Sequence, residues 1–236
     1  MNERPQPAYG VPNWEMLSRW MQLDPHDDGP FWALNLMKYH AVARYADSRD
    51  GVSGREADDA YAPLGPLAAV GATVVLVGDV RDQALGDPAW DRVAIVRYPT
   101  RAAFFAMQER DDFKTQHVHK EAGMECTIVM SCLPIDSIAE GITEGSLVLV
   151  VGHDAGVAPI PGATEIAHFS VEGVIVGDDR SFADLRFWRV ADPGVVDALV
   201  AALSVPEGTQ VLVVDPTIDR LLASVNEADA GPGALP

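Results

Sequence analysis

The chain has 236 residues and a formal net charge of −18 at neutral pH; 48% of the residues are hydrophobic and 22% are charged. This is the composition of an ordinary globular protein, long enough for one large domain or for two of roughly 100 residues each. The negative charge repels phosphate backbones, and no cluster of lysine or arginine relieves it locally. Nucleic acid is therefore not an expected partner.

The sequence predicts neither a membrane span nor a secretion signal. Its longest apolar runs are far shorter than the roughly 20 residues that a membrane helix needs, and its beginning is polar and proline-rich. We therefore expect a cytoplasmic protein without a membrane partner. Cys126 and Cys132 are the only cysteines. They fall on one expected strand, too far apart to bridge each other, which predicts reduced thiols.

The first half alternates between predicted strands and helices. Asn13 can cap a short helix, and a turn cluster ends it. Next come a strand at 31–38, a helical stretch from 40 towards 47, helical turns at 56–70 broken by prolines, strands at 72–80 and 92–98, helices at 101–108 and 111–122, and a strand at 124–132. We interpret Glu56, Asp58 and Asp59 as favourable first-turn charges. The order strand, helix, strand, strand, helix, strand is that of a ferredoxin-like βαββαβ unit.

The second half repeats this order in part, which predicts a degenerate ferredoxin-like unit without its first helix. Its expected elements are strands at 146–152, 164–176 and 182–190, a helix at 193–203, a strand at 210–214 and a short helix at 217–225. The predicted organisation is an N-terminal helical extension at 1–29, a ferredoxin-like domain at 30–134, a linker at 135–145, the degenerate unit at 146–225 and a flexible tail at 226–236.

Four short stretches of the first half carry a family resemblance. They are LNLMKY at 34–39, GA at 71–72, VRYPTRAAF at 96–104 and HVHK at 117–120. Over about residues 30–133 the chain resembles a bacterial family of dimeric α+β barrel proteins, known mainly as a domain of unknown function.

The resemblance implies an α+β fold in which helices cover one face of a four-stranded sheet and a second sheet packs on the other. In relatives another subunit supplies the second sheet. A homodimer is thus implied here, or an intramolecular pseudo-dimer closed by the second unit. The superfamily includes cofactor-independent monooxygenases, isomerases and cyclases, and also haem-binding enzymes, so it fixes no single chemistry.

Two polar residues interrupt the apolar strands and are candidates for substrate binding. Alternation places Asn35 on one face of the strand at 31–38 and Arg97 on one face of the strand at 92–98. Because these strands are neighbours in the expected topology, both side chains can share a face and line a cavity. Alternatively, Arg97 pairs with a carboxylate across a sheet interface and Asn35 binds the backbone.

His117 and His119 are the candidate catalytic residues, as acid–base groups at a pocket mouth. Residues two apart on a helix point about 200° apart, so the two cannot hold one metal ion unless the segment is extended, and no metal site is predicted. The alternative is a solvated helix face or a structural histidine. Tyr39, Tyr61 and Tyr98 can supply hydroxyls to a polar group of a substrate, although tyrosine more often packs its ring and bonds locally.

The sequence lacks a nucleophile elbow, a phosphate-binding loop, a dinucleotide fingerprint and zinc-ligand spacing. Our first hypothesis is an enzyme without a tightly bound cofactor that acts on a small, largely apolar organic molecule by monooxygenase, isomerase or cyclase chemistry. The second is a non-catalytic module for small-molecule binding or assembly, and the third is a haem or metal protein.

Overall fold

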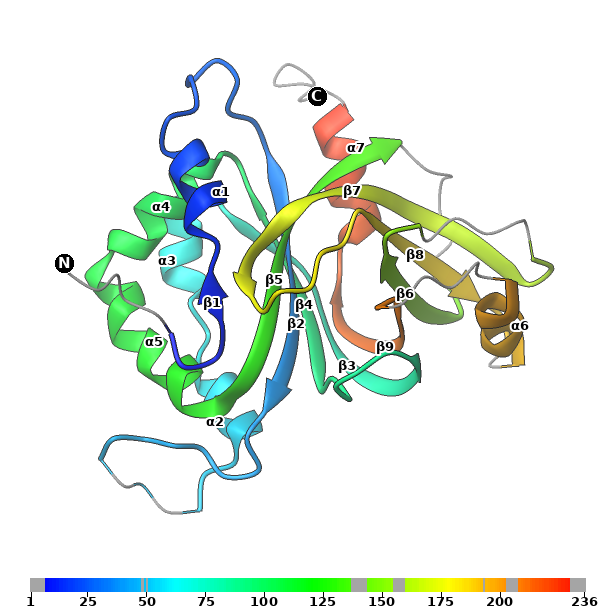
Figure 1. Cartoon of the computed structure of the whole chain (residues 1–236), viewed down its shortest axis with the longest axis horizontal. Coiled ribbons are helices and arrows are strands. Elements are labelled where there is room, and N and C mark those ends of the chain that lie inside the picture. The colour runs from blue at the N-terminus through cyan, green and yellow to red at the C-terminus, as the bar shows by residue number, and fades with distance from the viewer. Residues whose placement is uncertain are drawn as a thin grey trace.

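A computed structural model gives the fold of the chain and describes residues 7–47, 49, 51–136, 144–154, 160–192, 194–202 and 208–229. The fold is α+β, and its described strands form one nine-stranded sheet in the order β1-β7-β5-β2-β4-β3-β9-β6-β8. Strand β8 also pairs with β7, so the eight strands from β7 to β8 close into a barrel within one chain (Figure 1). Every ladder is antiparallel.

The strands divide equally between the two halves of the chain, apart from the short β1. Their bounds are β1 Val11–Pro12, β2 Phe31–Tyr39, β3 Thr73–Leu85, β4 Arg92–Tyr98, β5 Met124–Asp136, β6 Ser146–Gly152, β7 Ala163–Gly177, β8 Asp184–Val190 and β9 Gln210–Asp219. In space the first half has the order β5-β2-β4-β3 and the second half the order β9-β6-β8-β7. Taken in chain order within each half, both are arranged fourth, first, third, second.

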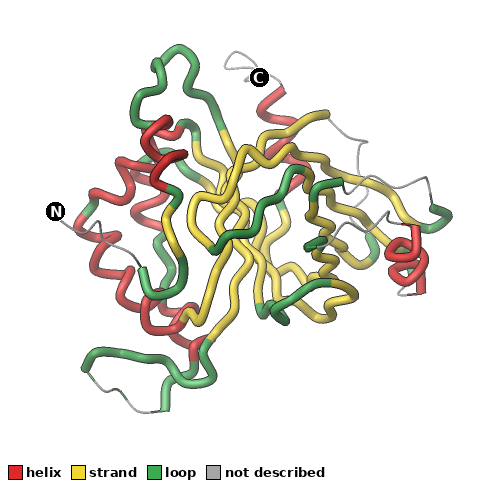
Figure 2. Tube along the Cα trace, viewed as in Figure 1, coloured by secondary structure: helices red, strands yellow, loops and turns green. Residues whose placement is uncertain are grey.

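Most of the helices cluster on one flank of the barrel, outside its strands (Figure 2). The seven helices of the described chain are α1 Trp14–Trp20, α2 Gly54–Ala60, α3 Leu64–Ala69, α4 Arg101–Glu109, α5 Asp111–Gly123, α6 Gly194–Ala202 and α7 Leu221–Asp229. Local sequence signals set their starts. Asn13 accepts a hydrogen bond from the Met16 amide, and Ser53 forms a reciprocal capping box with Glu56.

Alternation along β2 separates two hydrophobic cores. Trp32, Leu34 and Leu36 point into the barrel, where the Trp32 ring lies 5.9 Å from that of Phe169. Phe31 and Ala33 point outwards into a second core beneath the helices. The two faces of β2 therefore have different partners: the second half of the chain on the inside, and the helices on the outside.

Several predicted elements differ from those observed. Residues 40–47 do not form a helix: the chain there is irregular, and its amides bond to distant carbonyls, as Arg44 N does to Ala122 O at 2.7 Å. Strand β9 continues to Asp219, where a helix from residue 217 was expected, because it pairs along β3. The stretch at 56–70 is broken between α2 and α3, where Pro63 lies, whereas Pro66 lies within α3 and does not end it.

Most of the expected linker (137–143) and the end of the expected tail (230–236) lie outside the described residues. At their margins β5 extends to Asp136 and α7 extends to Asp229. None of the helices in the described part of the chain has the length and apolar character to cross a lipid bilayer.

Candidate functional site

A cavity of about 360 Å³ lies between the outer face of the sheet and helices α2 to α5. Its walls are mostly apolar side chains from both layers, and small residues of neighbouring strands, Ala33 and Ala94, leave room at its floor. A concave, mostly apolar space with a few inward polar groups is the usual form of a small-molecule site.

At one end of the cavity, His117 and Lys120 of α5 lie one helical turn apart and contact the same two tyrosines. His117 Nε2 is 2.9 Å from the hydroxyl of Tyr9, and the Lys120 ammonium lies 5.3 Å from the centre of the Tyr9 ring. The Tyr61 ring lies 5.9 Å from the His117 ring and 5.6 Å from the ammonium. Residues three apart on a helix share a face, so both side chains reach the cavity together.

Burial shifts the pKa values of the histidine, the lysine and the two tyrosines. It lowers the pKa of His117 to about 4, with a further contribution from the positive charge of Lys120. Burial likewise lowers the pKa of Lys120, an effect that the carboxylates of Asp58 and Glu121 partly oppose. The pKa of Tyr9 and that of Tyr61 are raised by burial, so both hydroxyls are protonated at neutral pH. His117 is therefore a neutral imidazole that lies between neutral phenols, with a carboxylate oxygen of Glu121 3.6 Å from its Nε2.

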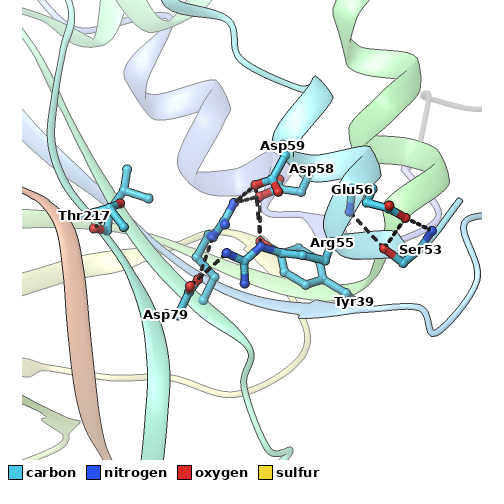
Figure 3. A network of polar contacts seen from close by, with 10 residues as sticks. Tyr39, Ser53, Arg55, Glu56, Asp58, Asp59, Asp79 and Thr217 are labelled. Carbon is cyan, nitrogen blue, oxygen red and sulfur yellow. Dashed lines mark hydrogen bonds and ion pairs between the residues drawn. The ribbon is translucent and has the colours of Figure 1, made fainter.

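Elsewhere in the lining, ion pairs link α2 to the sheet (Figure 3). Asp58 accepts hydrogen bonds from the Tyr39 hydroxyl at 2.6 Å and from Arg92 at 2.8 Å. Arg92 also binds Asp59 and Asp79. Asp58 and Arg92 are largely buried, so water competes little for their ion pair. The pair therefore holds α2 against the sheet at this part of the cavity wall.

The structure brings four of the seven candidate residues to the cavity and places a fifth beside it. The four are His117, Asn35, Tyr61 and Tyr98. Tyr39 joins the cavity through its bond to Asp58. Asn35 Nδ2 donates to Ala33 O at 3.1 Å, the backbone contact considered as the alternative to ligand binding.

The expected shared face of Asn35 and Arg97 is wrong. The register pairs Asn35 with Ala94 and Arg97 with Trp32. Arg97 therefore shares the barrel-facing side with Trp32, and its guanidinium lies 5.4 Å from the centre of that ring. The error arises because parity along a single strand does not give the offset between two strands.

The structure does not bring His119 to the cavity either. Its Nδ1 is 2.7 Å from the hydroxyl of Tyr45, in the irregular segment after β2. The helical conformation expected at 117–120 is confirmed, and it directs the two histidines to different tyrosines on different sides of α5.

Several cavity residues escaped the sequence analysis, above all Tyr9, Lys120, Asp58 and Arg92. Tyr9 lies in the N-terminal extension and reaches the site only through tertiary contacts. Asp58 and Asp59 were interpreted as first-turn charges, whereas α2 begins at Gly54 and ends at Ala60, so both belong to its last turns. The spacing of His117 and Lys120 along one helix face was a usable signal for Lys120.

Metal ligands do not gather anywhere in the described part of the chain, where no three His, Cys, Asp or Glu side chains are placed to hold one ion. Cys126 and Cys132 are both free thiols on β5. Burial raises the pKa of each, so neither thiol is activated as a nucleophile.

Comparisons with known proteins find partial structural similarity. No protein-family model matches the chain, and no curated protein does. A crystal structure of RPA0582, a protein of unknown function from Rhodopseudomonas palustris, is 27% identical, with a TM-score of 0.47 over 55% of this chain and 98% of its own. A mutant chlorite dismutase from Candidatus Nitrospira defluvii in complex with cyanide is 11% identical, with a TM-score of 0.45 over 85% of this chain and 95% of its own. The geometry of the cavity therefore has to carry the functional argument.

Proposed function

We propose that this chain is a small-molecule enzyme that acts, without a tightly bound cofactor, on a small and largely apolar organic substrate. The observation that carries the proposal is the pairing of His117 with Tyr9 at the wall of an otherwise mostly apolar cavity. An apolar cavity selects an apolar substrate body, and one proton-transferring group at its wall is the minimum for catalysis. Monooxygenase, isomerase and cyclase chemistry all fit this description.

His117 is the catalytic acid–base residue in this proposal. Its neutral ring takes up a proton from the bound substrate and returns it, while the Tyr9 hydroxyl orients the ring. The low pKa means that the protonated ring returns its proton readily. Asn35, Tyr61 and Tyr98 contact the substrate from the walls, and Tyr39 fixes the position of Asp58.

The proposal includes the architecture of the dimeric α+β barrel. We assign a ferredoxin-like domain to residues 30–134 and a degenerate one to 146–225, forming an intramolecular pseudo-dimer. The identical spatial order of four strands in each half supports this division. Most of the described residues that line the cavity belong to the first half, and the second half adds Ile175 and Val176 of β7 and Ile218 of β9.

The first test compares the two histidines of α5. Purified protein is incubated with a small-molecule extract, and compounds consumed are identified by mass spectrometry. We expect His117→Asn to slow consumption by about 10²-fold or more, the usual contribution of an acid–base group. His119→Asn is the matched control, since His119 also bonds to a tyrosine but stands outside the cavity, and it should consume at the wild-type rate. Equal consumption by wild-type protein and His117→Asn would refute the catalytic role.

A non-catalytic binding module is the second candidate, and a specific observation favours it. Several polar groups of the cavity already have protein partners: Asn35 donates to Ala33 O, and Tyr98 donates to Met107 Sδ at 3.3 Å. Groups that already bond within the protein are not free to bond to a ligand. The cavity would then select its ligand by shape. If the protein only binds its ligand, the extract should contain compounds that stabilise the protein against heat, and the protein should consume none of them.

A further inference from the structure

Lys120 is one of only three lysines in the sequence, and its environment differs from that of the other two. It is 9% exposed and lines the cavity, with its ammonium over the faces of Tyr9 and Tyr61. Lys38 is 3.3 Å from Asp91, and Lys114 is 3.5 Å from Glu109, so both have carboxylate partners near the surface. No carboxylate among the described residues stands within ion-pair distance of the Lys120 amine.

This environment favours the neutral amine of Lys120. Removing an ammonium from water is costly unless a carboxylate compensates, and two ring faces compensate only in part. The carboxylates that act on it, Asp58 and Glu121, do so without direct contact, and burial outweighs them in lowering its pKa. A neutral, desolvated lysine amine is a nucleophile, whereas the ammonium is not.

The charges of the cavity indicate which ligand this amine meets. Asp58 and Asp59 contribute two carboxylates, Arg92 contributes one permanent positive charge, and the nucleophilic form of the Lys120 amine is neutral. Because Arg92 is already bound by both carboxylates, an anionic ligand gains no net attraction. A neutral ligand fits the mostly apolar walls better.

We propose that Lys120 is the nucleophile of this cavity and that it binds a small aldehyde or ketone covalently, as an imine. The ligand has an apolar body and a carbonyl group that faces α5. This proposal rests on the proposed function in one respect: the cavity must be the ligand site. It goes further in naming the substrate class and the group that reacts.

The bond changes need no oxidant or reductant. The amine nitrogen attacks the carbonyl carbon, the C=O π electrons move to oxygen, and one proton passes from nitrogen to that oxygen, giving a carbinolamine. Protonation of its hydroxyl and loss of the remaining N–H proton then release water and form C=N. His117 and Tyr9 adjoin the amine and already share a hydrogen bond of 2.9 Å, so they carry the proton that leaves nitrogen to the departing oxygen.

The test is reductive trapping with benzaldehyde and sodium cyanoborohydride on the full-length protein near neutral pH. A cavity of about 150 Å³ holds benzene, so the larger one here has room for this probe. With only three lysines, peptide mass spectrometry assigns each benzyl adduct. We expect Lys120 to be modified about tenfold faster or more than Lys38 and Lys114, because burial lowers the pKa of its amine and the cavity holds the aldehyde beside it. Modification of Lys120 at the same rate as the other two, or more slowly, would overturn the proposal.

Two variants and one non-reactive probe complete the design. Lys120→Met should lose the fast adduct, whereas Lys114→Met, the control on the same helix, should keep it. Benzyl alcohol has the same body and no carbonyl group, so its thermal stabilisation of the protein reports the cavity alone. Stabilisation without a fast Lys120 adduct refutes the imine and leaves the cavity as a ligand site. Absence of both the stabilisation and the adduct refutes the proposed function as well.

Discussion

The difference between His117 and His119 shows how much of this site is decided by single residues. Both are partly buried, and each lies within hydrogen-bonding distance of a tyrosine hydroxyl. Helical spacing predicts that they face different ways, and this is confirmed. The spacing does not say which of them faces the cavity, because the answer depends on Tyr9, 108 positions away along the chain.

The shifted pKa of His117 predicts a loss of stability in mild acid. In the unfolded chain the ring has its ordinary pKa of 6.5, and in the fold its pKa is about 4, through burial and the nearby Lys120 charge. Between these two pH values the unfolded chain binds a proton that the folded chain does not. The free energy of unfolding should therefore fall by up to about 3 kcal/mol as the pH drops from 6.5 towards 4.

Urea unfolding at a series of pH values in this window measures the effect. His117→Asn should remove most of the slope, because asparagine keeps a polar group beside Tyr9 and does not titrate. His40→Asn is the comparison variant, since burial and Arg44 also lower the pKa of His40, which is more exposed. If the free energy of unfolding of His117→Asn fell with pH as steeply as that of the wild type between pH 6.5 and 4.5, the claim that His117 is buried in its neutral form would be refuted.

At the scale of elements, local signals in the sequence correctly predicted where helices start. The pairing of distant strands could not be predicted from such signals. Caps and breakers act on their own neighbours: Thr100 caps α4, whose start was expected at residue 101. The face on which Arg97 lies was set by the offset between β2 and β4, which no residue of either strand encodes by itself. Asp58 could not be recognised as a cavity residue because its partner Arg92 is on another element.

Two glycines allow α2 and α5 to pack closely. Both helices line the cavity, so this contact helps to hold its wall in place. A Cβ on Gly54 would stand 2.5 Å from the Gly123 carbonyl oxygen, and one on Gly123 would stand 2.6 Å from that of Gly54. We expect Gly54→Ala and Gly123→Ala each to lower the free energy of unfolding by about 1–3 kcal/mol, because backbone has to move to admit the methyl group. Urea unfolding measures the change.

Gly65→Ala in α3 is the matched control. Nothing lies within 4 Å of a Cβ at that position, and alanine is favoured over glycine in a helix by about 0.5–1 kcal/mol. This variant should therefore be as stable as the wild type or slightly more so. A loss of stability equal to that of Gly54→Ala would mean that α2 and α5 do not approach as closely as the structure has them.

At the scale of the whole molecule, the strands of each half could be predicted from the sequence, but the closure of the barrel could not. The closure depends on the two ladders between the halves, β3–β9 and β5–β7. Pairings between strands so far apart in the chain leave no local pattern. The resemblance left open whether a second subunit or the second half supplies the partner sheet, and here the second half does so.

A shared barrel core predicts that the two halves unfold together. The rings of Trp32 on β2 and Phe187 on β8 both pack against Phe169 on β7, at 5.9 Å and 6.3 Å between centroids. Phe187 is fully buried in this core. Replacing it with alanine should lower the free energy of unfolding by about 3–5 kcal/mol, through lost burial and the cavity left behind.

Because the first half closes over this same core, we expect the loss to be felt there too. Hydrogen exchange should show the slowest amides of β2 and of β8 losing protection by the same amount in Phe187→Ala. Val11→Ala, at a side chain that is 53% exposed, should change neither. A loss confined to β6, β8 and β9 would show that the second half opens on its own. Ile175 and Val176 of β7 and Ile218 of β9 line the cavity under α5, so its ligand binding should weaken in a chain whose second half is unfolded.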